Sequence, residues 1–157
     1  MKTKLWVDFQ IGTLKWVAPF VDFILRLWVA NIFFKSGLTK ISSWESTITL
    51  FENEYQVPIL SPEIAAYLAT GTELIIPVLL FFGLGTRLSA VILFVFNIIA
   101  VISYPDLGEV GQAMHTYWGM ILLVIIAYGP QLLSLDFWIS SRCQKVQSQK
   151  LEAAGGA

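Results

Sequence analysis

The sequence predicts an all-α integral membrane protein, an antiparallel bundle of four transmembrane helices. Apolar residues make up 56% of the 157 residues, charged residues only 13%, and the mean hydropathy is +0.69. The apolar residues are gathered into four runs, each close to the roughly 20 helical residues that cross a hydrocarbon layer of about 30 Å. Between the runs stand short segments rich in Gly, Pro and Ser, which are typical of the connections between helices.

The first span is expected at about residues 17–35, and an amphipathic helix on the outer surface follows at about 43–56. The large apolar side chains of this second segment recur at spacings of four, three and four residues: Trp44, Ile48, Phe51 and Tyr55. Such a helix is either a lid over a pocket that opens outward or an interfacial spacer with aromatic anchors. The sequence favours the spacer, because aromatic residues gather at membrane interfaces in any case.

The second and third spans are expected at about residues 63–82 and 87–104. Ser61-Pro62-Glu63 supplies a capping Ser, a first-turn Pro and an acid before the second span, and Gly83-Leu84-Gly85 ends it. A link this short makes the two spans antiparallel neighbours.

The fourth span is expected at about residues 113–133, with a kink or an early stop at Gly129-Pro130. Residues 1–141 are therefore predicted to form a single membrane domain. The polar segment 142–157 is expected to be a disordered cytoplasmic tail.

The distribution of Lys and Arg predicts that both termini are cytoplasmic, because basic residues concentrate on the cytoplasmic side of membrane proteins. Only Lys35 and Lys40 fall on the other side. The remaining basic residues that flank the spans share one side: Lys2, Lys4, Lys15, Arg87, Arg142, Lys145 and Lys150.

Composition also excludes several classes of function. With 10 Lys and Arg against 11 Asp and Glu, the chain is not a basic nucleic-acid binder. A single Cys, Cys143, cannot form an intramolecular disulfide or a dithiol pair, and a single His cannot supply paired haem ligands. No Walker loop, GxGxxG or HExxH motif is present. We therefore expect no metal, haem or flavin in this chain, and redox work would need electrons from a partner protein.

Four ionisable residues are expected at membrane depth, where each needs a partner or a purpose: Asp22, Arg26, Glu73 and His115. Arg26 and Glu73 each lie about ten residues from the outer ends of their spans and are predicted to meet near the midplane. Asp22 stands four residues before Arg26 and shares its helix face. The three charges sum to minus one, so one carboxyl would carry a proton, which suits proton-coupled chemistry. Equally, the pair could serve only to fix the helix register.

Three polar residues are candidates for an outward-facing vestibule above the charged pair: Asn31, Asn97 and His115. As substrate-binding groups they could hydrogen-bond a small molecule, and His115 could donate a proton or a hydrogen bond to a quinone-type carbonyl. Purely structural roles are favoured for all three, because Asn commonly joins helices by hydrogen bonds and His115 stands in an aromatic interfacial segment.

The chain resembles the DoxX family of small four-span bacterial membrane proteins, from about Arg26 to Asp136. Span one carries Leu25-Arg26-Leu27, Phe33, Gly37 and Lys40, with Ala30 where the family usually has Gly. Glu73 and the run Gly83-Leu84-Gly85-Thr86-Arg87-Leu88 follow, with Ile76 and Pro77 in place of the usual small residues. Gly129-Pro130 and Ser134-Leu135-Asp136 resemble the closing signature.

This resemblance implies a bundle in the bacterial inner membrane with Arg26 and Glu73 as a shared polar centre. Members have been named as subunits of a terminal quinol oxidase or a thiosulfate:quinone oxidoreductase, and others as membrane partners in redox or peptide-modification systems. Our leading hypothesis is a membrane subunit of a quinone-linked redox system, with electrons from a redox or biosynthetic partner protein. Arg26 and Glu73 are the expected catalytic residues, which orient a quinone headgroup or relay its proton, and Asp22 joins the three vestibule residues as an expected binding group. The alternatives are a nonenzymatic transport component for a small solute or protons, and a membrane scaffold for a soluble enzyme.

Overall fold

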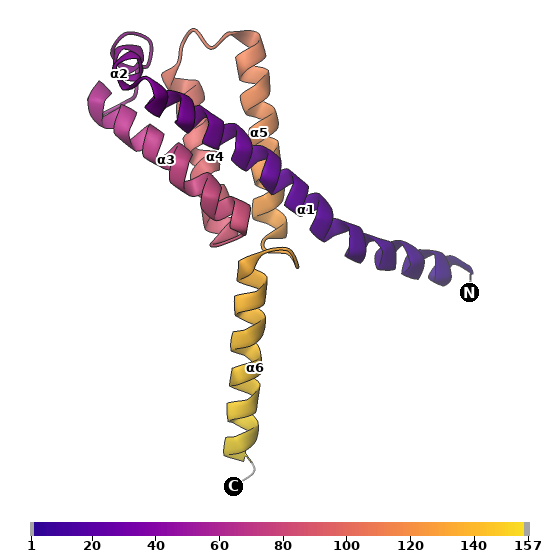
Figure 1. The fold of residues 1–157 in the computed structure, drawn as a ribbon. Coiled ribbons are helices and arrows are strands. Elements are labelled where there is room, and N and C mark those ends of the chain that lie inside the picture. Colours follow the sequence, from indigo (N-terminus) through magenta and orange to yellow (C-terminus); the bar gives the residue numbers. More distant parts are fainter. Residues whose placement is uncertain (1, 156–157) are drawn as a thin grey trace.

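The computed structural model describes the backbone of residues 2–155 and the side chains of residues 16–149, and this part of the chain is helical without any strand (Figure 1). The side chains of Lys2, Lys4, Lys15 and Lys150, which count toward the predicted orientation, lie outside the described ones. The six helices are α1 (Lys2–Ser42), α2 (Trp44–Asn53), α3 (Pro62–Phe82), α4 (Thr86–Ser103), α5 (Gly108–Tyr128) and α6 (Leu135–Gly155).

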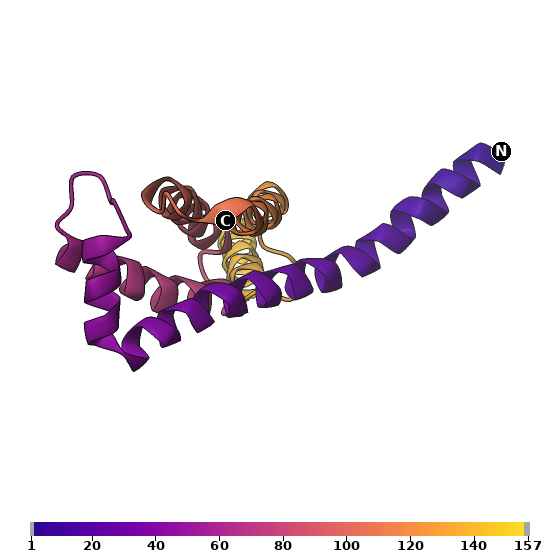
Figure 2. The same cartoon turned by 90° about the horizontal axis from the view of Figure 1, so that it is seen from above.

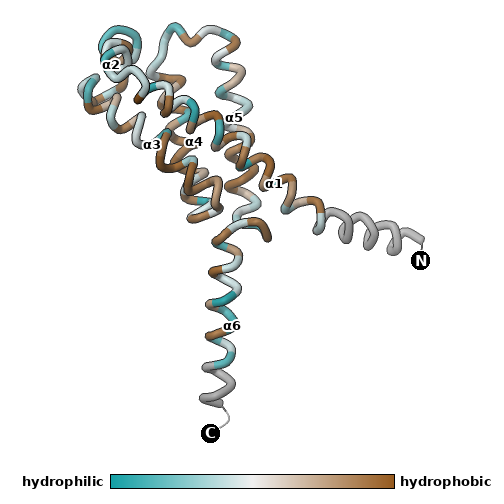
Figure 3. The backbone as a smooth tube through the Cα atoms, in the orientation of Figure 1, coloured by the Kyte–Doolittle hydropathy of each residue, from teal (hydrophilic) through white to brown (hydrophobic). Residues whose placement is uncertain are grey.

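Four segments are long and apolar enough to cross a membrane, which confirms the four predicted spans: Trp16–Ser42 of α1, and the whole of α3, α4 and α5. Hydrophobic residues run along all four (Figure 3). The first span continues to Ser42 rather than ending near residue 35. The fourth ends at Tyr128, because Gly129 has a φ of 70° and Pro130 follows it, so the early stop replaces the predicted end at residue 133.

The helices pack around one buried apolar cluster. Helix α1 lies across α3 and also contacts α5, while α4 packs between α3 and α5 (Figures 1 and 2). Side chains from all four spans fill the cluster: Val29, Phe33, Leu80, Leu93, Leu122 and Ile125. The opposite faces of the same helices expose large apolar side chains, as expected for surfaces that contact lipid.

Helix α2 is held against the end of α3 by aromatic packing. Phe51 is buried against Ala65 and Ala66 of α3, and the Tyr55 ring stacks 4.6 Å from Phe51 and 5.0 Å from Tyr104. Two hydrogen bonds tie the following loop to the end of α4, from Gln56 N to Ser103 O at 2.7 Å and from Tyr104 Oη to Glu54 Oε2 at 2.8 Å. These contacts hold α2 and the loop after it against the ends of α3 and α4.

Helix α6 extends away from the spans (Figure 1). We expected disorder after residue 141, whereas the chain is helical through Gly155. The physical reason lies in the sequence of this segment: no Gly or Pro interrupts residues 135–154, and Gln, Lys, Leu, Glu and Ala are good helix formers.

The turn between α3 and α4 requires glycine at Gly83. Its φ is 68°, and a Cβ atom there would lie 2.5 Å from Ser134 Cβ and 2.7 Å from Arg26 Nη1. The backbone N–H of Asp136 also donates to the Gly83 carbonyl at 3.0 Å, so the turn lies directly against the start of α6.

We predict that Gly83→Ala lowers the free energy of unfolding by about 2 to 4 kcal/mol, through the positive φ and the clash with Ser134. Gly71→Ala is the matched control on α3, because a Cβ there meets nothing within 4 Å. This control should be neutral or stabilise by up to about 1 kcal/mol. Thermal unfolding of the detergent-solubilised protein measures both, and equal effects would contradict the clash.

Candidate functional site

Arg26 and Glu73 do not meet, so the predicted polar centre is corrected to two separate centres. Arg26 pairs with Asp22, which is on the same helix, α1. Glu73 of α3 pairs instead with Lys40, near the end of α1. The expected proximity of Asp22 to Arg26 is confirmed, with Nε to Oδ2 at 2.9 Å.

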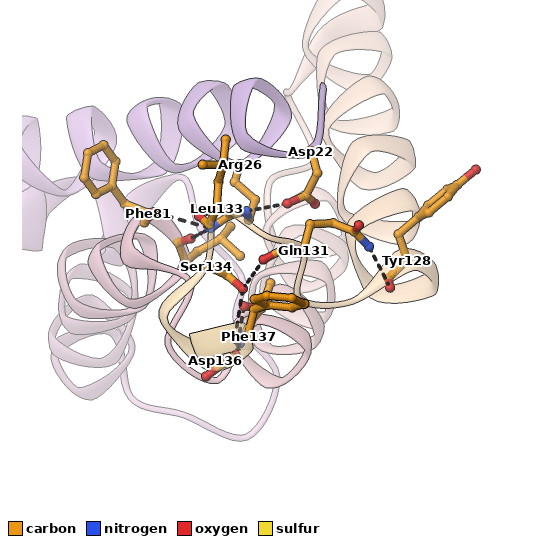
Figure 4. A network of polar contacts seen from close by, with 11 residues as sticks. Asp22, Arg26, Phe81, Tyr128, Gln131, Leu133, Ser134, Asp136 and Phe137 are labelled. Carbon is orange, nitrogen blue, oxygen red and sulfur yellow. Dashed lines mark hydrogen bonds and ion pairs between the residues drawn. The ribbon is translucent and has the colours of Figure 1, made fainter. Parts of the chain in front are cut away.

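The guanidinium of Arg26 is fully buried and donates from all three of its nitrogens (Figure 4). Nη1 reaches the carbonyls of Leu80 at 3.3 Å and Phe81 at 3.5 Å, which are in the last turn of α3. Nη2 donates to the Leu133 carbonyl at 2.8 Å. A cation at the carboxyl end of a helix satisfies unpaired carbonyls and opposes the negative end of the helix dipole. Arg26 therefore joins α1, α3 and the segment before α6.

Asp136 completes this joint from the other side of the turn. Its carboxylate accepts hydrogen bonds from Gly85 N at 2.9 Å and Thr86 N at 2.7 Å, and from Thr86 Oγ1 at 2.9 Å. Partial burial alone would raise the pKa of Asp136, but the N–H donors of Thr86 and Gly85 outweigh it and hold the pKa below 3.8. The ionised carboxylate thus caps the start of α4.

Glu73 lies in the second polar centre, together with two residues of α1. Lys40 Nζ donates to Glu73 Oε2 at 2.7 Å and Oε1 at 3.0 Å, and Ser36 Oγ donates to Oε1 at 3.1 Å. Lys40 Nζ is also 3.0 Å from Ser36 Oγ. The helices approach closely here, because a Cβ on Gly37 would lie 3.1 Å from Glu73 Cβ. The result is a compact ion pair that is almost wholly buried.

The register of α1 explains why the sequence predicted the wrong partner for Glu73. The prediction ended span one near residue 35, but α1 continues to Ser42. Glu73 is therefore level with Ser36, ten residues beyond Arg26, which is about 15 Å along a helix. Lys40 was missed for the same reason, since it was placed outside the membrane. Its spacing of four from Ser36, and its place among the residues of the family resemblance, were the available signals.

A cavity of about 470 Å³ adjoins the Lys40–Glu73 pair, between α3, α4, α2 and the loop that follows α2. Its walls are mainly apolar or aromatic, and Lys40 and Glu73 are the charged residues on it. Several wall residues are also exposed on the outer faces of the spans, so the cavity borders the surface that contacts lipid: Leu68, Val91, Val95 and Ile99. The aromatic wall residues are Phe51, Tyr55 and Phe96.

Of the predicted vestibule, two residues lie together and one lies apart. His115 Nδ1 is 2.7 Å from Asn97 Oδ1, and Asn97 Nδ2 donates to the His115 backbone carbonyl at 2.9 Å. The amide thereby joins α4 to α5. Asn31 is exposed and lines a separate cavity of about 280 Å³ between α1 and α3. The three residues therefore do not line one vestibule.

Comparison with known proteins gives one family and two relatives. The model of the DoxX family matches residues 21–105. A Bacillus subtilis protein named "Putative oxidoreductase CatD" is 35% identical over 132 residues, covering 82% of this chain and 87% of the relative. A Haemophilus influenzae protein without a functional name is 34% identical over 122 residues, covering 72% and 79%. No solved structure matches the chain.

We predict that Arg26→Met lowers the free energy of unfolding by about 3 to 5 kcal/mol, because it leaves Asp22 and the carbonyls of Phe81 and Leu133 without a donor, whereas the Leu80 carbonyl keeps the N–H of Gly83. Asp22→Asn tests the pair from the other side. The double variant should lose less than the sum of the single variants, by about 0.5 to 3 kcal/mol, since they share one ion pair. Denaturant unfolding in detergent measures this coupling, and strict additivity would contradict the pairing.

We predict that acid lowers the free energy of unfolding by protonating Asp136, whose carboxylate holds the start of α6 against the start of α4. Because its pKa is lowered in the folded protein, the stabilisation is present above the unfolded value of 3.8 and disappears as the pH falls through the folded value. Wild type should therefore lose more stability between about pH 5 and pH 3 than Asp136→Asn does. Acid titration of stability for wild type and Asp136→Asn measures the difference. Parallel curves for the two proteins would contradict the prediction.

Proposed function

The chain belongs to the DoxX family, and on that premise we propose that it is the membrane subunit of a quinone-linked oxidoreductase system. The cavity beside Lys40 and Glu73 is the proposed site for the quinone headgroup. The observation that carries this proposal is the pairing of apolar walls with one buried ion pair, in a cavity that borders lipid.

The residues present suit a quinone. Ligand cavities of 300 to 1,000 Å³ accept drug-sized molecules, and they combine mostly apolar walls with a few polar groups that fix orientation. Phe51, Tyr55 and Phe96 give the cavity an aromatic wall for apolar contact with a flat headgroup. The lipid-exposed wall around Leu68 and Val95 leaves room for an isoprenoid tail to stay in the bilayer.

Lys40 and Glu73 have complementary roles in this proposal. Reduction of a bound quinone to the quinol takes up two electrons and two protons. Lys40 orients a quinone oxygen through its ammonium group, and the carboxyl group of Glu73 passes the two protons in turn, taking up each from bulk water. The electrons come from a partner oxidoreductase, since this chain has one Cys and one His. Ser36 keeps the Glu73 carboxyl in place through its hydroxyl.

Arg26 and Asp22 have a structural role in this proposal rather than the catalytic and binding roles that the sequence suggested. The nitrogens of Arg26 are engaged with Asp22 and with backbone carbonyls, and neither residue lines the cavity. We further propose that the protein lies in the bacterial inner membrane with both termini in the cytoplasm, following the distribution of Lys and Arg.

We predict that Glu73→Gln weakens binding of a decyl-substituted 1,4-benzoquinone at least tenfold, because the neutral amide keeps only one acceptor oxygen and no longer fixes the Lys40 ammonium group that orients the quinone oxygen. Quenching of tryptophan fluorescence in lipid nanodiscs measures the affinity. Glu63→Gln is the matched control, since Glu63 is exposed in the first turn of the same helix. It should bind like wild type.

Thermal unfolding of both variants separates loss of binding from loss of the fold. Equal quinone affinity in wild type and Glu73→Gln, at matched stability, would contradict the proposed site. Uptake of a small solute into proteoliposomes without any redox partner would instead support the transport alternative.

A further inference from the structure

Ser103 has a buried hydroxyl that the protein itself does not satisfy. It is the last residue of α4, is 1% exposed and lines the same cavity as Lys40 and Glu73. Its Oγ has no hydrogen-bond partner, although its backbone carbonyl accepts the N–H of Gln56 at 2.7 Å. A buried hydroxyl without a partner is costly, so native structures rarely keep one that has no use.

The hydroxyl and the ion pair mark different ends of the cavity. Glu73 lies ten residues before the Gly83 turn on α3, and Ser103 lies eighteen residues after Gly85 on the antiparallel α4. At 1.5 Å per residue the two backbones are therefore offset by about 12 Å along the spans. Side chains tilt toward the start of their own helix, so Glu73 leans toward the level of Ser103 and Ser103 toward that of Glu73.

Between these ends the cavity wall is largely aromatic. Tyr55 is stacked between Phe51 and Tyr104, the neighbour of Ser103, so the edge of its ring, rather than a ring face, is left for a ligand. Phe51 and Tyr55 both line the cavity, and Phe96 faces it from α4. A ligand held here contacts aromatic rings along its body and polar groups at its two ends.

We propose that Ser103 donates a hydrogen bond to the ligand, which therefore carries an acceptor oxygen at each end of a ring. This inference rests on the proposed function and specifies it. A 1,4-quinone, with carbonyls on opposite sides of the ring, fits both polar ends, with one oxygen at Lys40 and Glu73 and the other at Ser103. A molecule with a single carbonyl uses only the ion pair.

The test compares two probes in nanodiscs, a decyl-substituted 1,4-benzoquinone and a decyl-substituted cyclohexenone with one carbonyl. Ser103→Ala should weaken quinone binding about fivefold, the effect of losing one neutral hydrogen bond, and leave cyclohexenone binding unchanged. Ser103→Thr keeps the hydroxyl and should retain the preference for the quinone. Ser89→Ala is the matched control, because Ser89 is a buried Ser of the same helix whose Oγ already donates to Leu84 O at 3.2 Å.

Ser103→Ala should fold at least as stably as wild type, since it removes an unsatisfied polar atom. Equal loss for both probes, or no loss for either, would overturn the role of Ser103 and leave the Glu73 site standing. Failure of wild type to bind the quinone, or quinone binding that Glu73→Gln does not weaken, would overturn the proposed function and this inference with it.

Discussion

The structure depends on one buried guanidinium. Arg26 is taken wholly out of solvent and is stabilised there by one carboxylate and three backbone carbonyls. A charge in this environment is tolerated only when its donors are satisfied, so the positions of α1, α3 and the segment before α6 are fixed together. The Gly83 turn can pass beside the guanidinium only because it lacks a side chain, and Asp136 holds the next helix against that turn. Several residues of the family resemblance belong to this joint: Arg26, Gly83, Gly85, Thr86 and Asp136.

The Arg26 joint and the Glu73 centre differ in what their polar groups contact. The donors of Arg26 are committed to carbonyls and to Asp22, which leaves little capacity for a ligand. Lys40 and Glu73, by contrast, lie on the wall of a cavity. Lys40 comes from the end of α1, where a long aliphatic stem can cross apolar surface and present its charge elsewhere. The close approach of the helices at Gly37 lets this stem reach Glu73.

The sequence predicted the helices better than it predicted how they are aligned. The four spans and α2 follow from runs of apolar residues and from signals such as Ser61-Pro62 and Gly83, which act locally. The partner of Glu73 depends on the register of α1 against α3, and the end of the first span lies about two turns beyond the predicted one. Ser103 could not be singled out from sequence, because its importance lies in a missing partner that only the folded arrangement reveals. Helix formation in α6 follows from the helix propensities of its residues, although the segment is polar.

In the proposed site, the lipid-exposed wall of the cavity determines the ligand concentration to which a binding affinity refers. A ligand that enters past Leu68 and Val95 is already dissolved in the bilayer, so its effective concentration is its mole fraction in the membrane. Each methylene of an acyl chain adds about 0.8 kcal/mol to partition into the bilayer, and a tail that stays in lipid gains nothing further on binding. Tail length therefore governs how much ligand the membrane holds, whereas selection among headgroups falls to the few polar atoms inside the protein. Modest intrinsic affinity is enough to fill such a site from a lipid-soluble pool.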